Sequence, residues 1–110
     1  QITSLGMPIN PYLWKASLNT ISFMPLSSTD PFAGTIITDW YTAETNLGER
    51  CKLNIFISGK DLKTNNLKVL SFCQTLKKNQ WVNLPSKIEE NIKLENVILN
   101  EAKKLKLTSG

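Results

Sequence analysis

Apolar and polar residues follow two different periods along this chain, and the change of period separates its elements. Asn10 and then Pro11 mark a helix start, because asparagine caps a helix and proline fits its first turn. Apolar residues then recur at helical spacing until Pro25, which has no amide hydrogen to continue a helix. The pattern predicts an amphipathic helix over 11–23 and a loop over 25–34.

Three stretches with period-two alternation follow, as is typical of strands with one buried face. In the first of them, regular alternation places Trp40 on the same face as Ile36 and Thr38. A tight turn at 77–79 leads to a further short segment, which is either a fourth strand or an extended edge. The three strands are predicted at 35–42, 50–58 and 66–76, and the short segment at 80–84.

The apolar faces of the second and third strands determine how these strands pair. In an antiparallel arrangement, one register places every core-facing residue of one strand opposite a core-facing residue of the other. The predicted pairs are Ile57 with Leu67, Ile55 with Val69, Leu53 with Ser71, and Cys51 with Cys73.

A second helix is predicted at the end of the chain. Ser86 and Glu89 have the spacing of a capping box, and Asn91 is a competing start one turn later. The broader apolar arc of this helix is the expected core face. It consists of Leu94, Val97, Ile98, Ala102 and Leu105.

This order of elements predicts a single α+β domain over 1–110. It is a two-layer sandwich, in which an antiparallel meander of three to four strands carries both helices on one face. Residues 1–9 are expected to form an extended arm and residues 107–110 a frayed tail.

The composition removes most kinds of catalytic site. There is no histidine, the two cysteines are far apart in sequence, and the five glycines never cluster. A zinc site, a serine hydrolase triad and a glycine-rich phosphate loop are therefore not predicted. An enzyme would need a pocket that joins Asp30, Asp39 and Arg50, and nothing in their spacing brings them together. We expect no catalysis, no metal and no cofactor.

Cys51 and Cys73 are the two residues with distinctive chemistry. Opposed positions on adjacent strands approach the separation that a disulfide requires. Two small buried thiols are an equally good interpretation, because free cysteine is commonly buried. The residues alone leave both interpretations open.

The second face of the predicted sheet is not purely polar. Three apolar residues of the second and third strands lie on it, and a tryptophan follows in the short edge segment. Such a face is a candidate for contact with a protein partner, although core packing is the ordinary role of Trp14, Trp40 and Trp81. The candidate surface consists of Phe56, Leu70, Phe72 and Trp81.

The net charge of +4 is unevenly distributed. Residues 60–110 contain ten lysines and five acidic residues, and mixed charges along a helix normally form a solvated face. Arg50 is the one arginine, which makes nucleic acid a weak candidate partner. The alternative to a protein partner is an anionic ligand, either a nucleic acid or a lipid headgroup. Its candidate patch consists of Lys77, Lys78, Lys103 and Lys104.

The first half of the chain contains several short motifs. They are Asn10 with Leu13, Trp14, Ala16 and Leu18, then Ser-Phe-Met-Pro-Leu at 22–26, Asp-Pro-Phe at 30–32, Gly34 and Ile-Thr-Asp-Trp-Tyr at 37–41. In these motifs the chain resembles an uncharacterised family of small alphaproteobacterial cell-envelope proteins, which are often preceded by a lipoprotein-type signal. Further similarity covers Glu49-Arg50, the second and third strands, Trp81-Val82 and residues 94–105.

The resemblance implies a location rather than an activity. Because the periplasm is oxidising, it favours a disulfide between Cys51 and Cys73. No apolar run approaches the roughly 18 residues of a membrane helix, so any anchor is expected upstream of Gln1. We expect a non-enzymatic binding or assembly module in the periplasm or at the periplasmic side of the outer membrane. It would act on a protein through the second sheet face or the loop from Phe23 to Gly34.

Overall fold

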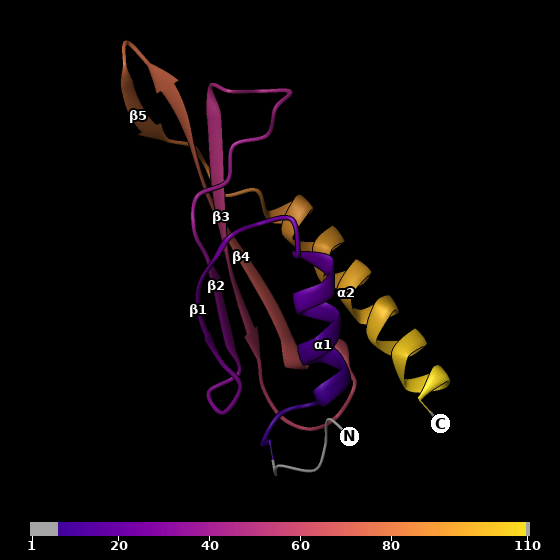
Figure 1. Ribbon diagram of the computed structural model, residues 1–110. Helices are drawn as coiled ribbons and strands as arrows, with labels where there is room; N and C mark the ends of the chain where they lie inside the picture. The colour runs from indigo at the N-terminus through magenta and orange to yellow at the C-terminus, as the bar shows by residue number, and fades with distance from the viewer. Residues whose placement is uncertain (1–6, 110) are drawn as a thin grey trace.

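The computed structural model describes residues 7–109, which form one antiparallel sheet and two helices. Both helices, α1 (Pro11–Thr20) and α2 (Ile88–Thr108), cover the same face of the sheet (Figure 1). The predicted α+β class and the order helix, meander, helix are therefore confirmed. Among the described residues, neither helix is long and apolar enough to cross a bilayer.

The sheet has five strands, and their order in space is their order in the chain. The strands are β1 (Leu26–Asp30), β2 (Thr35–Thr38), β3 (Glu49–Ile57), β4 (Leu67–Lys77) and β5 (Gln80–Asn83), and a short 3₁₀ turn, η1 (Thr64–Asn66), precedes β4. All four predicted pairs between β3 and β4 are present, including Cys51 opposite Cys73. The segment at 80–84 does form a strand, after a turn in which Lys78 and Asn79 have the positive φ of a tight hairpin.

The core lies between this sheet and the helices. Its central strand residues, Ile55 and Val69, are fully buried. They pack in one cluster with Leu13 from α1 and with Ile98 and Ala102 from α2. The alternation that predicted the β3–β4 register thus reports the face that the helices cover.

The segment 25–34, predicted as a loop, is instead a β-hairpin. Its first strand, β1, pairs with β2, and all five β1 residues are exposed. A strand exposed on both faces has no alternation of apolar and polar residues, so the sequence pattern does not predict it. The turn is closed by Asp30, whose carboxylate accepts hydrogen bonds from the N–H groups of Phe32 and Ala33.

The start of α1 is as predicted. Asn10 Oδ1 accepts hydrogen bonds of 2.9 Å from the N–H groups of Tyr12 and Leu13. The helix ends at Thr20, three residues earlier than predicted, and continues as a turn in which Met24 N–H donates to the Ile21 carbonyl.

The start and core face of α2 differ from the prediction. Within the described chain no side chain caps this helix, so the Ser86–Glu89 capping box is not formed. Val97, expected in the core, is 53% exposed, whereas Leu99 is buried. The helix also continues through Thr108, part of the predicted frayed tail. At the other end of the chain, Ile9 of the predicted extended arm is a buried core residue, and residues 1–6 of that arm lie outside the described residues.

Trp40 lies on the opposite face from the one predicted. The strand predicted over 35–42 ends at Thr38, and one extra residue lies between Ile37, which pairs with Asn54, and Tyr41, which pairs with Cys51. An extra residue on one strand exchanges the faces of everything beyond it. Trp40 therefore points away from the helices.

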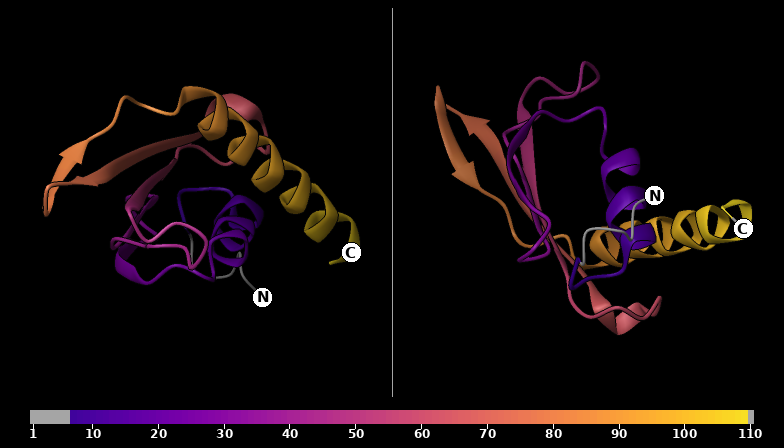
Figure 2. Two further views of the ribbon diagram at one scale, coloured as in Figure 1. Left: turned by 90° about the horizontal axis from the view of Figure 1, so that it is seen from above. Right: turned by 60° about the horizontal axis from the view of Figure 1, so that its bottom comes forward.

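The molecule is elongated, with principal extents of 52 × 23 × 22 Å. The β4–β5 hairpin projects at one end and the C-terminal end of α2 at the other (Figures 1 and 2). The outer face of the sheet, which neither helix covers, lies between these ends.

Candidate functional site

The outer face of the sheet carries a stack of two tryptophans around an arginine. The guanidinium carbon of Arg50 lies 4.4 Å from the ring centroid of Trp40 and 4.3 Å from that of Trp81. Lys52, the next outward residue of β3, has its Nζ 4.9 Å from the Trp40 ring. Contacts of this kind combine apolar packing with attraction between a cation and a ring face.

Hydrogen bonds hold the arginine of this stack in place. Its Nε and one terminal nitrogen both donate to Gln74 Oε1, at 2.9 and 2.7 Å. Gln74 in turn donates from Nε2 to Asn83 Oδ1 at 2.8 Å. One row of side chains therefore links β3, β4 and β5 across the outer face.

Beyond this row the outer face is apolar and cationic. Phe56, Leu70 and Phe72, which the sequence predicted for this face, are 37%, 37% and 45% exposed. Two cations alternate with them, because Lys52 lies opposite Phe72 and Lys68 lies opposite Phe56. The fourth predicted residue, Trp81, is half-buried in the arginine stack. No outward-facing position of β3, β4 or β5 is acidic.

An open groove of about 450 Å³ adjoins this face where β4 meets α2. Its apolar walls are Leu70 and Phe72 from β4 and Ile88 and Ile92 from α2. Ile88 is 65% exposed and Ile92 is 49% exposed. The groove thus extends the apolar surface around the edge of the sheet.

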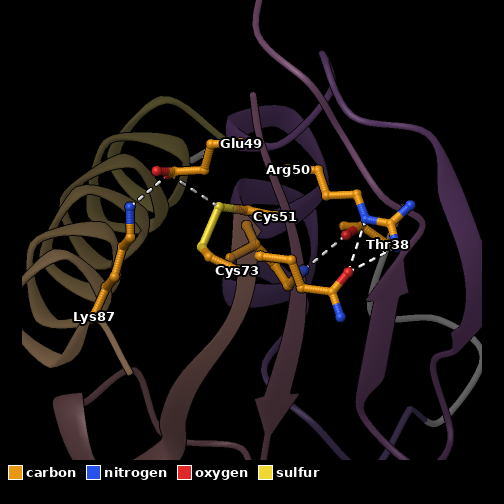
Figure 3. Close-up of a disulfide and its surroundings, with 8 residues drawn as sticks. Thr38, Glu49, Arg50, Cys51, Cys73 and Lys87 are labelled. Carbon is orange, nitrogen blue, oxygen red and sulfur yellow. Dashed lines mark hydrogen bonds and ion pairs between the residues drawn. A yellow bond between two sulfur atoms is a disulfide. The ribbon is translucent and has the colours of Figure 1, made fainter. Parts of the chain in front are cut away.

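Cys51 and Cys73 form a disulfide on the helix-facing side of the sheet, with their Cα atoms 4.1 Å apart (Figure 3). Cys51 exchanges both of its backbone hydrogen bonds with Tyr41, at 2.8 and 3.0 Å. Its pairing with Cys73 is therefore one of the closely spaced pairs without mutual hydrogen bonds. The disulfide interpretation, one of the two that the sequence left open, is the one that the structure adopts.

An ion pair lies beside the disulfide. Lys87, which precedes α2, places its Nζ 2.7 Å from Glu49 Oε2 (Figure 3). The same carboxylate lies 3.8 Å from Cys51 Sγ, a contact rather than a hydrogen bond since a disulfide sulfur has no hydrogen to donate. Glu49, Cys51 and Cys73 are close enough to hold a metal ion. Both sulfurs are already bonded to each other, however, so this cluster does not offer thiolate ligands.

The four lysines of the predicted anionic-ligand patch are not brought together. Lys77 and Lys78 lie at the tip of the β4–β5 hairpin, and Lys103 and Lys104 lie in the C-terminal part of α2. These are the opposite ends of the molecule (Figure 1). They therefore do not form one site.

The three residues that an enzyme would need are also separate. Asp30, the last residue of β1, pairs with Thr35 at the start of β2, whereas Asp39 follows the other end of β2. The Asp39 carboxylate accepts a hydrogen bond from Trp40 N–H, and Arg50 is held between its tryptophans. The groove between β4 and α2 is lined by none of the three.

The stack around Arg50 was not predicted from the sequence. Alternation alone places Arg50 on the face opposite to that of Cys51, but it places Trp40 on the face of Ile36 and Thr38, which the helices cover in the structure. The missing information was the extra residue after β2, for which Asp39 is a weak signal because its side chain bonds to the next backbone N–H.

Comparison with known proteins identifies the family. The model of a family described as "Domain of unknown function (DUF3576)" matches residues 7–107. The uncharacterized protein RP420 of Rickettsia prowazekii (strain Madrid E) is 39% identical over 106 residues, which are 96% of this chain and 64% of that protein. No solved structure matches the chain. With nearly its whole length covered by the family model, the chain belongs to this family, a domain of unknown function.

Proposed function

We propose that the chain is a non-enzymatic binding module that holds a protein partner against the outer face of its sheet. The observation that carries this proposal is the exposure of Phe56, Leu70 and Phe72 on a face that neither helix covers. Single exposed apolar residues are ordinary on a protein surface, whereas several gathered on one uncovered face are a common feature of binding surfaces.

The charges of the outer face define the partner's surface. Lys52 and Lys68 interrupt the apolar residues, and no outward position of β3, β4 or β5 carries a carboxylate to neutralise them. An interface is specific when opposite charges meet across it. The proposed partner therefore presents apolar side chains with acidic residues between them.

The compartment of this function is proposed to be the periplasm or the periplasmic side of the outer membrane. The Cys51–Cys73 disulfide supports an oxidising compartment, because disulfides are rare where thiols are kept reduced. The resemblance to envelope proteins points the same way. An anchor upstream of Gln1 would hold the module near the membrane.

Photocrosslinking in the cells that produce the protein tests the proposal. p-Benzoylphenylalanine replaces either Phe56 or Phe72 on the outer face, or else Val97 or Leu107 on α2. Because the two α2 positions are 53% and 83% exposed, they are at least as accessible as the outer face. We expect a discrete protein adduct from Phe56 and Phe72 and none from the α2 positions. Adducts that are equal at all four positions, or lipid adducts alone, would contradict a protein-binding outer face.

The lysine patch gives the competing function less support. An anionic surface would have to contact Lys77 and Lys103 at opposite ends of a molecule 52 Å long. Binding to heparin or anionic vesicles that falls steeply with salt and is lost in a Lys103→Gln, Lys104→Gln variant would favour this function over ours.

A further inference from the structure

One half of β4 has an unpaired backbone edge beside α2. β5 pairs with β4 only from Gln74 to Lys77. The last bond on this side is donated by Leu84 N–H to the Cys73 carbonyl at 2.9 Å, and the chain then leaves the sheet toward α2 (Figure 1). The residues from Leu67 to Ser71 therefore form a sheet edge that no strand covers.

The alternation of the β3–β4 ladder decides which backbone groups face this edge. Leu53 donates its N–H away from β4, to Thr38 Oγ1 at 2.8 Å. Leu53 and its partner Ser71 are therefore a pair without mutual hydrogen bonds. In such a pair the N–H and C=O groups point away from the partner strand, so those of Ser71 face the free edge.

Ser71 is the open position of this edge. The N–H groups of the two alternate residues before it are already bonded, since Leu67 donates to the Thr64 carbonyl and Val69 donates to Glu95 Oε2 at 2.8 Å. No strand pairs with Ser71 on the edge side, and its buried Oγ has no hydrogen-bond partner in the described chain. Polar groups in such positions ordinarily have partners.

The groove lies directly at this position. Ser71 lines it together with the exposed apolar side chains of Ile88 and Ile92. Its volume of about 450 Å³ falls within the range of roughly 300 to 1,000 Å³ that is typical of ligand sites. Open main-chain hydrogen-bonding groups and an apolar pocket therefore occur side by side.

We propose that this groove takes an extended peptide segment of the partner, which adds to the sheet as a strand at Ser71. The peptide main chain would supply an acceptor for the Ser71 N–H and a donor for its carbonyl, and an apolar side chain would enter the groove. An acyl chain would satisfy neither group, which is why a peptide is the occupant. The proposal rests on the protein-binding function above and names the mode of binding.

Peptide selection with matched variants tests this mode. A phage library of random seven-residue peptides is selected against the oxidised chain, and an enriched peptide is synthesised with a fluorescent label for anisotropy. Ile92→Lys places a charge in the groove, and Val97→Lys makes the same change at a similarly exposed α2 position outside it. Ser71→Pro removes the edge N–H and leaves the β3–β4 hydrogen bonds intact.

We expect enriched peptides with alternating apolar residues, and slower hydrogen exchange of the Ser71 amide when they bind. Ile92→Lys and Ser71→Pro should each weaken binding at least about tenfold, and Val97→Lys less than about twofold. If Ser71→Pro does not fold, the comparison of Ile92→Lys with Val97→Lys, together with the hydrogen exchange of the Ser71 amide, still tests whether the peptide occupies the groove.

Three outcomes would overturn the strand-addition mode. One is a peptide that binds equally to the wild type and to Ile92→Lys. Another is a peptide that ignores the groove variants but is lost with Phe56→Ala, which would leave the outer-face function standing. The third is a library without enriched peptides together with a fluorescent fatty acid that Ile92→Lys releases, which would assign the groove to acyl chains.

Discussion

Arg50 of β3 and Trp81 of β5 are in contact across the strand that separates them, with the guanidinium carbon 4.3 Å from the ring centroid. Gln74 lies between the two residues on β4 and accepts both hydrogen bonds of Arg50. This contact links β5 to β3 on the outer face, in addition to the backbone pairing of β4 with both strands.

Replacing Arg50 by alanine should lower the free energy of unfolding by about 2 kcal/mol. The substitution removes two ring contacts, each about 0.5 to 1 kcal/mol, and the hydrogen bonds to Gln74. Lys68→Ala is the control, because Lys68 is also an outward cation of this face but has no such ring contact among the described residues. Urea unfolding of both variants checks the prediction, and equal stability of the two would contradict it.

Loss of the disulfide should cost about 3 kcal/mol. The bond joins residues 22 apart in sequence, and closing a loop of that size removes about this much conformational freedom from the unfolded chain. A Cys51→Ser, Cys73→Ser variant should unfold at lower urea and should not respond to reductant, whereas the wild type should become less stable when reduced. A wild type whose unfolding midpoint ignores reductant, or two free thiols in unreduced protein, would refute the assignment.

Thr38→Val should destabilise the fold although the two side chains have almost the same shape. Thr38 is 1% exposed, and its Oγ1 accepts the N–H of Leu53 at the point where β2 ends. The substitution leaves that N–H without an acceptor, at a cost of about 1 to 3 kcal/mol. Thr29→Val in the exposed strand β1 is the control and should change stability by less than about 0.5 kcal/mol. Thermal unfolding of the two variants measures the difference.

Gly34→Ala should be among the most damaging single substitutions. Gly34 has a φ of +76°, and a Cβ there would overlap the carbonyl oxygen of Ile57. We expect a loss of at least about 2 kcal/mol, because the left-handed conformation and the overlap both oppose a side chain. At Gly48 a Cβ would meet only Asn46 Oδ1, at 3.6 Å, so Gly48→Ala should fold normally. Similar stabilities of the two variants would show that the β1–β2 turn tolerates a side chain.

The period of two in the sequence predicted the β3–β4 register, and hence that Cys51 lies opposite Cys73. Such alternation is informative where one face of a strand is buried, as it is for Ile55 and Val69. β1 has no buried face, so the same rule could not detect it. The fold class was therefore predictable from the central strands, and the number of strands was not.

The candidate site was predictable only in part. Phe56, Leu70 and Phe72 follow from alternation along β3 and β4, and the structure places them outward. The position of Trp40 depends on one extra residue after β2, and the groove depends on where α2 starts relative to β4. Both are matters of spatial arrangement between elements, which periodicity within one element does not encode.

Arg50 and Cys51 are consecutive, so their side chains leave β3 on opposite sides. Two links therefore cross the sheet at the same position along β3. The disulfide lies on the helix-covered face, and the contacts of Arg50 with two tryptophans lie on the outer face. A reducing agent breaks only the disulfide. The β4–β5 hairpin should therefore keep its alignment with β3 in reduced protein, although the fold is less stable. A partner that binds the outer face would contact the same surface in either redox state.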